Sequence, residues 1–470
     1  MLWVGALALL CSVQSTFQTD AGLKGRITQK GLDYGRQVGM EVLKSQLQKM
    51  VIPDISGTHH VPVVGDVDYT VSGIQIQDFQ LPESVVGLSP GTGIKLSISN
   101  AKILITGYWH VKVMFIRDSG SFDLSVDGLT ISAVLGVTHD ESGRPAVWNA
   151  GCSSNVGGLH VTFHGGASWL YNLFTGALEG PLRGQLNANL CPEVDTAIGQ
   201  LEGILKTIQV SAQIDPFAEI DYSLVSAPQI TDQNMDLDFK GEFYNVGHHS
   251  EPPYTPAPFS ILGQSDQMLY IGVSEFFANS AGFVYFTSGA LQINLTDNMI
   301  PKESPIRLNT ESFGAIIPEL PKRYPSMPMM LHLSALKQPM LTCQPGRLDL
   351  AASGSVAAFV ILRNSTLAPV FLLQLDSTVK GQVFISEQKI SGSLALNNFT
   401  VSLTHSDVGP FKVETLQTML FWALQLVVIP EVNAKLREGF PLPTIANLRL
   451  VTPTVTVNQG HMLITTDVQY

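Results

Sequence analysis

Charged side chains are scarce in this chain of 470 residues, since Asp, Glu, Lys and Arg make up only 14% of it. Soluble domains usually carry about 25%. The low value indicates either much apolar surface to enclose or a β-rich chain whose exposed strand faces carry Ser, Thr and Asn. Cations are scarcest in the first half, where residues 16–255 hold 14 Lys and Arg against 25 Asp and Glu. An acidic half argues against binding polyanions by bulk attraction. We therefore do not expect nucleic acid as a partner.

Sequence signals of enzymatic chemistry are also weak. No glycine-rich phosphate-binding loop is present. His160 and His164 would share one face of a strand, but no third ligand stands at a suitable spacing for zinc. His248 and His249 are expected to lie in a loop. We expect no catalytic residues, no metal site and no enzymatic activity.

Long apolar runs are few. Within residues 1–17, the stretch 2–13 is uncharged, apolar and too short to span a bilayer, which is typical of a secretory signal peptide. The next candidate, 419–429, is interrupted by Gln425 and followed by Pro430, so we expect a buried helix there. The mature protein is therefore expected to be soluble, secreted and extracellular.

Cysteine is rare as well, with four residues in the chain. Cys11 would leave with the signal peptide. Cys152 and Cys191 are the best candidates for a disulfide bond in an oxidising compartment, which leaves Cys343 as a buried free thiol, although other pairings stay open. In a secreted glycoprotein, Asn-x-Ser/Thr sequons are acceptors for glycans. Such sequons stand at Asn294, Asn364 and Asn398.

The chain divides into two halves of similar size. Segment 248–260 contains four prolines within seven residues, which predicts an extended, semi-rigid linker. It separates an N-terminal half, 18–247, from a C-terminal half, 261–470. Apolar periodicity predicts the same order in each half, with strands between two helices. The four helices are expected at about 22–50, 167–209, 273–288 and 413–437.

A short internal repeat supports duplication. SGSFDL at 119–124 is echoed by SGSLAL at 391–396, and LTIS at 129–132 by FTVS at 399–402. In both copies the alternation of apolar residues changes face between the two segments, which predicts a β-bulge, near Gly128 in the first copy. Two such copies indicate a duplicated unit and not a solenoid.

Glycine recurs every four residues in the first expected helix, at Gly31, Gly35 and Gly39. Glycine weakens a helix, so a packing reason is expected. One interpretation is close packing against another segment, and the other is contact with an acyl chain.

An aromatic and basic segment, 107–117, lies between two expected strands and predicts the end of a hairpin. Trp109 suits a membrane interface, and Lys112 and Arg117 suit contacts with phosphate. The alternative is an ordinary hairpin with a half-buried Trp109.

The sequence also resembles a known family, that of the bactericidal permeability-increasing and lipopolysaccharide-binding proteins. The resemblance runs the length of the mature chain. It is carried by GLKGRITQKGLDY (22–34), GIKLSISNA (93–101), SGSFDL (119–124), KGEFY (240–244), NMIPKES (298–304) and EGFPLP (438–443).

The resemblance implies an α+β boomerang of two pseudo-symmetric barrels, each a twisted antiparallel sheet wrapped on long helices, joined by a central sheet. Each barrel is expected to hold the acyl chains of a phospholipid in an apolar pocket. Cys152 and Cys191 fall where the family has its disulfide. The family binds lipid A of Gram-negative bacteria in innate immunity, and relatives transfer phospholipid or cholesteryl ester.

One departure from the family concerns its cationic N-terminal tip, which engages lipopolysaccharide. The segment 58–68 matches one basic loop of the tip but contains no Lys or Arg. Segment 108–117 matches the other loop and keeps Lys112 and Arg117, and Lys95 matches a family lysine near this end. The expected lipopolysaccharide site is therefore Lys95, Trp109, Lys112 and Arg117.

We thus expect a secreted, antimicrobial innate-immunity protein that binds lipopolysaccharide and phospholipid in hollow, hydrocarbon-lined pockets. The gain would come from burying methylenes, at about 0.8 kcal/mol each. Bound phospholipid is the expected ligand, with no cofactor, transient contact with membrane surfaces and a monomeric state. The alternative function is plasma transfer of phospholipid or neutral lipid without an antibacterial role.

Overall fold

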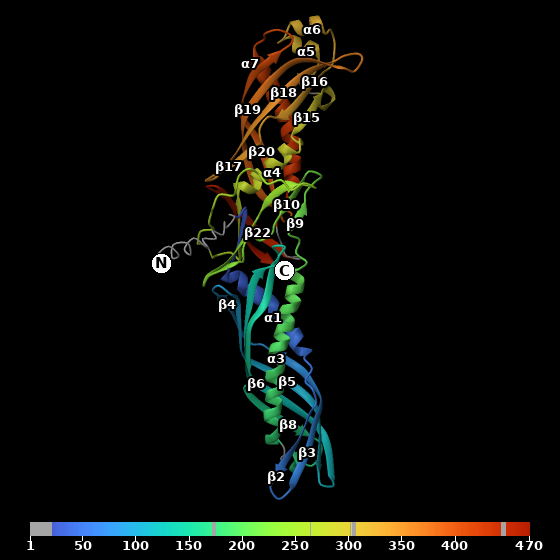
Figure 1. The fold of residues 1–470 in the computed structure, drawn as a ribbon, viewed down its shortest axis with the longest axis vertical. Helices are drawn as coiled ribbons and strands as arrows, with labels where there is room; N and C mark the ends of the chain where they lie inside the picture. The colour runs from blue at the N-terminus through green and yellow to red at the C-terminus, as the bar shows by residue number, and fades with distance from the viewer. Residues whose placement is uncertain (1–20, 172–174, 264, 301, 303–306, 443–447) are drawn as a thin grey trace, which may run out of the picture.

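The computed structural model describes residues 21–171, 175–263, 265–300, 302, 307–442 and 448–470. The expected signal peptide at 1–17, with Cys11, lies outside these residues. The molecule is elongated, with one half at each end and a shared sheet between them (Figure 1). Antiparallel sheets and long helices confirm the α+β fold class.

A long antiparallel sheet forms the N-terminal half. Its strands, in hydrogen-bonding order, are β2 (Ile55–Val61), β3 (Gly65–Gln80), β5 (Gly93–Val113), β6 (Ile116–His139) and β7 (Pro145–Asn155). Two further strands pair with β5 and β6, namely β4 (Glu83–Ser89) and β8 (Gly158–His164). The helices of this half are α1 (Gln29–Gln48), α2 (Ser168–Tyr171) and α3 (Thr175–Leu205). Sheet and helices share one apolar core.

The helix expected at 22–50 begins later than predicted. Residues Leu23–Thr28 form a strand, β1, and α1 starts at Gln29. The Thr28 hydroxyl caps this start by accepting a hydrogen bond from the Gly31 backbone N–H at 3.4 Å, as short polar side chains do at helix N-termini. β1 pairs on both sides with strands far along the chain, and such pairing leaves no local signal in sequence.

The bulge predicted near Gly128 is present. Register shifts between β5 and β6 leave Asp127 and Gly128 outside the regular pairing, and Gly128 has φ +67°, a conformation that favours glycine. Before the bulge Leu124 and Val126 are buried, and after it Leu129 faces the same core. The extra residue therefore keeps the apolar side chains of a 24-residue strand on one face.

The middle of the molecule is a six-stranded sheet drawn from both halves. Its order is β11 (Gln229–Ile230), β12 (Asn234–Phe239), β1, β14 (Leu269–Ser274), β23 (His461–Gln469) and β22 (Arg449–Asn458). β1 pairs antiparallel with β14, and each strand leads directly into a helix, α1 or α4 (Glu275–Thr287). The two halves thus meet through equivalent elements, as duplication predicts.

A small sheet lies beside this junction. It consists of β13 (Glu242–Asn245), β10 (Ala218–Asp221) and β9 (Ser211–Gln213). Phe243 of β13 packs against Phe277 of α4, with ring centroids 5.0 Å apart. Between β13 and β14, no strand or helix is assigned at 246–263 and 265–268, a stretch that includes the expected linker at 248–260.

The C-terminal half repeats the plan of the N-terminal half. Its strands are β15 (Gln292–Thr296), β16 (Met329–Ala335), β18 (Arg347–Ile361), β19 (Leu367–Ser386), β20 (Lys389–Ser406) and β21 (Phe440–Pro441), with β17 (Met340–Gln344) paired to β18. Short helical segments are η1 (Asp297–Met299), α5 (Thr310–Gly314) and α6 (Glu319–Arg323). β20 has a bulge at Asn397, between the two repeated motifs, as predicted.

The helix expected at 413–437 is confirmed, but it is less buried than predicted. It runs through α7 (Val413–Ala423), a π turn η2 (Leu424–Val428) and α8 (Ile429–Glu438). Leu416 and Leu420 are buried, whereas Trp422 is 46% exposed. By length and hydropathy this helix could cross a membrane, but Asn433 bonds both backbone groups of Leu394 in β20. The sheet covers only one side of the helix, which explains its exposed apolar face.

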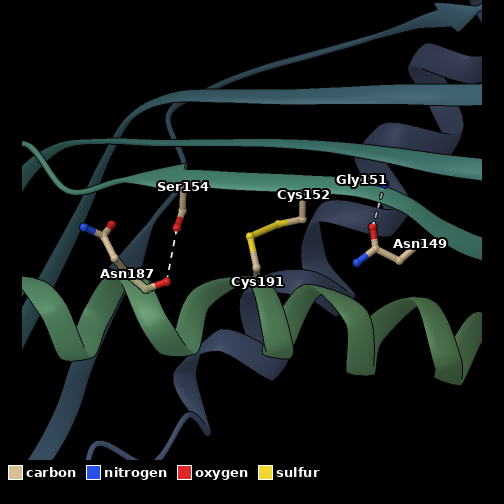
Figure 2. The surroundings of a disulfide bond; sticks show 6 residues. All are labelled: Asn149, Gly151, Cys152, Ser154, Asn187 and Cys191. Carbon is tan, nitrogen blue, oxygen red and sulfur yellow. Dashed lines mark hydrogen bonds between the residues drawn. A yellow bond between two sulfur atoms is a disulfide. The ribbon is translucent and has the colours of Figure 1, made fainter.

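A disulfide bond ties the N-terminal sheet to its helix. Cys152 of β7 is bonded to Cys191 of α3 (Figure 2), which confirms the expected pair. Nearby, the Ser154 hydroxyl donates to the Asn187 carbonyl of α3 at 3.5 Å. Cys343 is a buried free thiol, also as predicted, and burial raises its pKa to about 12.

Replacing both Cys152 and Cys191 by Ser should lower the free energy of unfolding of the N-terminal half by about 3–4 kcal/mol. The bond closes a segment with a sequence separation of 39, and opening such a loop restores entropy to the unfolded chain. Urea unfolding followed by near-UV circular dichroism measures the change. A Cys343→Ala variant is the control, since Cys343 belongs to a different core. An unchanged transition in the double variant would contradict this role.

Candidate lipid-binding sites

The inner face of the N-terminal half is entirely apolar. On α3 the buried residues recur every four positions, as Leu178, Leu182, Leu186, Leu190 and Val194. They pack with buried aliphatic and aromatic side chains of β3, β5 and β6. Among the described residues from 29 to 237, the buried side chains are hydrophobic, although Tyr69, Trp109 and Tyr222 also carry a polar group. This is the lining that hydrocarbon requires, because a buried polar group without a partner is costly.

The C-terminal half contains a small apolar cavity of about 30 Å³. It lies between β16, β19 and the helix that runs from α7 into η2. Phe313, Phe371, Leu416 and Trp422 are among its lining residues, all of which are apolar. Part of its wall is the exposed side of the helix, since Trp422 is 46% exposed.

This cavity in the C-terminal half is smaller than the hollow pocket that the sequence led us to expect there. About 30 Å³ is well below the roughly 300–1,000 Å³ of typical ligand pockets. In the N-terminal half the side chains meet in one continuous core. Side chains close such a space because an empty void forfeits dispersion contacts. An acyl chain needs more room than this cavity provides.

Two hairpin turns form the far end of the N-terminal half. β3 pairs with both β2 and β5, with Val61 opposite Gly65 and Val67 opposite Val113. The β2–β3 turn and the β5–β6 turn therefore lie next to each other, at the end away from the central sheet (Figure 1). We call these two turns the tip. The hairpin expected at 107–117 is thus confirmed.

The tip exposes a group of large apolar side chains that sequence reasoning missed. The exposed fractions are 104% for Val63, 66% for Met114, 100% for Phe115 and 49% for Ile116. Hairpin turns usually carry Gly, Asn, Asp or Ser. The runs VPVV at 61–64 and MFI at 114–116 are apolar instead. This departure was the sequence signal from which the exposed apolar tip could have been predicted. Exposed apolar groups of this kind mark surfaces that contact another apolar phase.

The backbone at the tip enters the left-handed region at a non-glycine residue in both turns, at Val63 (φ +74°) and at Met114 (φ +52°). Val63 has φ +74°, and a β-branched residue is rarely found in that region. Such a conformation costs on the order of 1–3 kcal/mol. Gly65 follows two residues later with φ +94°, as is normal for glycine. This cost is borne at the position that exposes the Val63 side chain most fully.

Lys112 and Arg117 lie directly behind the apolar tip. They are opposite each other in the β5–β6 ladder and both are exposed. Among the described residues, neither is within ion-pair distance of a carboxylate. They line a shallow surface hollow with Asp68 and Asp118. Two cations beside two carboxylates leave this region electrically neutral, in contrast to the cationic tip implied by the family resemblance.

The structure contradicts a surface role for Trp109. Its side chain is 0% exposed, and its Nε1–H donates to the Ser121 carbonyl at 3.1 Å. Gly120 lies opposite Trp109 in the ladder and leaves room for the indole ring. Trp109 has the same strand parity as the buried Ile103 and Ile105, and that alternation was a signal in the sequence. Its neighbour Tyr108 points outward and is 61% exposed.

Lys95 is also not part of the tip. It is exposed at the beginning of β5, and Lys112 is near the end of that strand. Lys112 is 17 positions further along the chain, which corresponds to about 55 Å at roughly 3.3 Å per residue. The family resemblance placed Lys95 near the tip. The sequence did not show that Lys95 and Lys112 stand at opposite ends of one long strand, β5.

The remaining candidate residues lie on the surface. The expected glycan acceptors Asn294, Asn364 and Asn398 are all exposed, as glycosylation requires. A Gly-x-Ser-x-Gly segment at 87–91 joins the antiparallel strands β4 and β5. A hydrolase nucleophile elbow needs a strand-to-helix turn, so this segment is an ordinary hairpin connection.

Comparisons with known proteins agree with this architecture. Residues 31–205 match the model of the LBP / BPI / CETP family, N-terminal domain, and residues 212–470 match that of its C-terminal domain. The chain belongs to the LBP / BPI / CETP family. A bactericidal permeability-increasing protein of Sebastes schlegelii is 45% identical over 99% of this chain and 98% of the relative. A lipopolysaccharide-binding protein of Mus musculus is 38% identical over 98% and 96%.

A solved structure of this family supports the fold. The crystal structure of a lipopolysaccharide-binding protein matches with a TM-score of 0.66 and 36% identity, over 96% of this chain and 99% of that one. The family resemblance seen in the sequence is therefore confirmed, together with the two barrels and the central sheet.

A Trp109→Phe substitution in this LBP / BPI / CETP family protein should lower stability and leave lipid binding unchanged. It removes the hydrogen bond to Ser121 and part of a buried ring, at a cost of about 1–3 kcal/mol. Thermal unfolding and lipopolysaccharide binding, measured well below the melting temperature, separate the two effects. Tyr108→Phe, at an exposed neighbour, is the control. A large loss of binding by folded Trp109→Phe protein would restore Trp109 as a contact residue.

Proposed function

We propose that this family member is a secreted, non-enzymatic, antimicrobial innate-immunity protein that binds lipopolysaccharide and phospholipid. The observation that carries the proposal is the exposed apolar tip, backed by two cations, at the end of a half whose interior is entirely apolar. The names of the relatives, bactericidal permeability-increasing protein and lipopolysaccharide-binding protein, support the same function. Contact with membrane surfaces is transient, and the protein acts as a monomer.

The apolar tip supplies the first contact. Val63, Met114, Phe115 and Ile116 enter the acyl region of a lipid layer, and each such side chain contributes about 1.5–3 kcal/mol when fully buried. Lys112 and Arg117 then lie at the depth of the phosphate groups, where exposed cations meet anionic lipid. Because the region is neutral overall, apolar insertion contributes more than long-range attraction.

The interior supplies the second contact, with acyl chains. Space for a chain opens when α1 or α3 moves away from the sheet. Glycine makes these helices easier to move, since Gly35 and Gly39 in α1 have no neighbour within 4 Å of a Cβ position, and neither do Gly180 and Gly184 in α3. Each costs a helix roughly 0.5–1 kcal/mol relative to alanine. Only Gly31 shows the close packing expected from the sequence, against the Met268 carbonyl.

A second candidate function is transfer of phospholipid or neutral lipid without an antibacterial role. The neutral tip favours it, since lipid transfer does not need strong attraction to an anionic surface. Saturable binding of labelled lipopolysaccharide by the full-length protein supports the first function. Binding to phosphatidylcholine vesicles without saturable lipopolysaccharide binding supports the second and overturns the first.

Replacing Phe115 and Ile116 by Ser should weaken lipopolysaccharide binding by at least about a hundredfold, because two buried apolar contacts are lost. Fluorescence titration of labelled lipopolysaccharide measures the affinity. Leu262→Ser is the matched control, since Leu262 is 77% exposed and lies far from the tip in the chain. Equal binding by the tip variant and the control would show that the tip is not the contact surface.

Replacing Lys112 and Arg117 by Ala should weaken lipopolysaccharide binding about two- to thirtyfold, the range expected for two exposed charge interactions. The effect should shrink at high salt. Phospholipid retained in the interior, measured by mass spectrometry of an organic extract, should not change. Lys95→Ala, at the other end of β5, is the control. If Lys95→Ala had the larger effect, the binding surface would lie elsewhere.

A further inference from the structure

A cluster of ionisable side chains lies at the junction between the two halves, far from the tip. Glu242 is the first residue of β13, and His249 and Glu251 belong to the start of the linker. The cluster also contains Lys240, which lies just before β13, and Asp221, the last residue of β10. None of these residues has a role in the lipid sites described above. The sequence pointed to no metal site here, because residues that are close in space come from a strand and a loop.

Three of these residues are close enough to hold one ion. One oxygen of Glu242, one of Glu251 and one ring nitrogen of His249 all lie within 4.8 Å of one another. His249 Nε2 is 4.0 Å from Glu251 Oε1, and the ring of His249 packs on Tyr244 of β13 with centroids 4.5 Å apart. That contact holds the imidazole over the strand that carries Glu242.

Glu242 is buried with one carboxylate oxygen unsatisfied. It is 3% exposed, and its Oε1 has no hydrogen-bond partner among the described residues. Its other oxygen, Oε2, is 3.1 Å from Lys240 Nζ. A buried carboxylate oxygen without a partner is costly. A cation bound to Oε1 would supply the missing partner.

The charge balance of the cluster points the same way. Lys240 Nζ lies between three carboxylates, at 3.1 Å from Glu242, 3.6 Å from Asp221 and 3.8 Å from Glu251. When all three carboxylates are ionised, one ammonium leaves two negative charges. One divalent cation would neutralise them, and Lys240 would keep Asp221 as its partner.

We propose that Glu242, His249 and Glu251 form a zinc-binding site that fastens the proline-rich linker to β13. Zinc is bound by His nitrogen and carboxylate oxygen at about 2.0–2.2 Å in tetrahedral geometry, with water at the fourth position. A nitrogen ligand favours zinc over Ca²⁺ and Mg²⁺, which prefer oxygen. His249 and Glu251 are 42% and 71% exposed, so both side chains are free to close onto the ion.

The consequence is a linker whose attachment depends on zinc. Glu242 belongs to a strand packed against the core at the junction, whereas His249 and Glu251 precede the prolines of the linker. An ion shared by strand and linker removes freedom from the linker and stabilises the junction. This inference is independent of the lipid that the protein binds.

The test is equilibrium dialysis of the full-length protein with ZnCl₂, together with the visible absorption of Co²⁺ as a probe of tetrahedral coordination. We expect the wild type to bind one zinc ion that both His249→Ala and Glu251→Gln weaken by at least about a hundredfold, more than the loss of an outer partner costs. His248→Ala is the matched control, because His248 is the adjacent histidine and lies outside the cluster. It should bind zinc as the wild type does.

A second measurement keeps the result clear if a variant folds poorly. Zinc should slow proteolysis of the linker in the wild type and in His248→Ala, but not in His249→Ala, with circular dichroism as a check on folding. Equal zinc binding by His248→Ala and His249→Ala would overturn the proposal. So would a preference for Ca²⁺ over zinc.

Discussion

The structure depends on keeping one face of very long antiparallel strands apolar. β5 and β6 are 21 and 24 residues long, and strict alternation over that length would turn apolar side chains away from the core as the sheet coils. The bulge at Gly128 corrects the parity, and the bulge at Asn397 does the same in the second half. With the inner face continuous, α1 packs against it through Leu43 and Leu47, and α3 through the row from Leu178 to Val194.

The low charge content of the chain follows from its large apolar interior. The inner faces of both halves hold hydrocarbon side chains, so the charged residues that remain are placed on the surface, at the junction and near the tip. At the tip, Lys112 and Arg117 are balanced by Asp68 and Asp118, and exposed Phe115 and Val63 extend beyond them. This member of the family thus presents an apolar surface where the resemblance implied a cationic one.

The junction depends on contacts between distant parts of the chain. β1 pairs with β14, and both are followed at once by a helix, so the two halves are joined by main-chain hydrogen bonds and not by the linker alone. Arg26 of β1 donates from Nε and Nη2 to the two carboxylate oxygens of Asp236 of β12, each at 2.7 Å. The linker then crosses this sheet, with Phe259 stacked on His461 of β23.

The sequence by itself determined the two-fold plan, the long helices, the parity shift near Gly128 and the hairpin at 107–117, because apolar periodicity and turn residues are local properties. It also placed the chain in its family and singled out Cys152 and Cys191. Only the tertiary structure decided that residues 23–28 form a strand, that Trp109 faces inward, and that Lys95 lies far from Lys112. The same is true of the apolar tip and of the cluster around Glu242. Strand pairing, strand length and the meeting of distant turns depend on contacts between segments that are remote in the chain, and no local pattern encodes them.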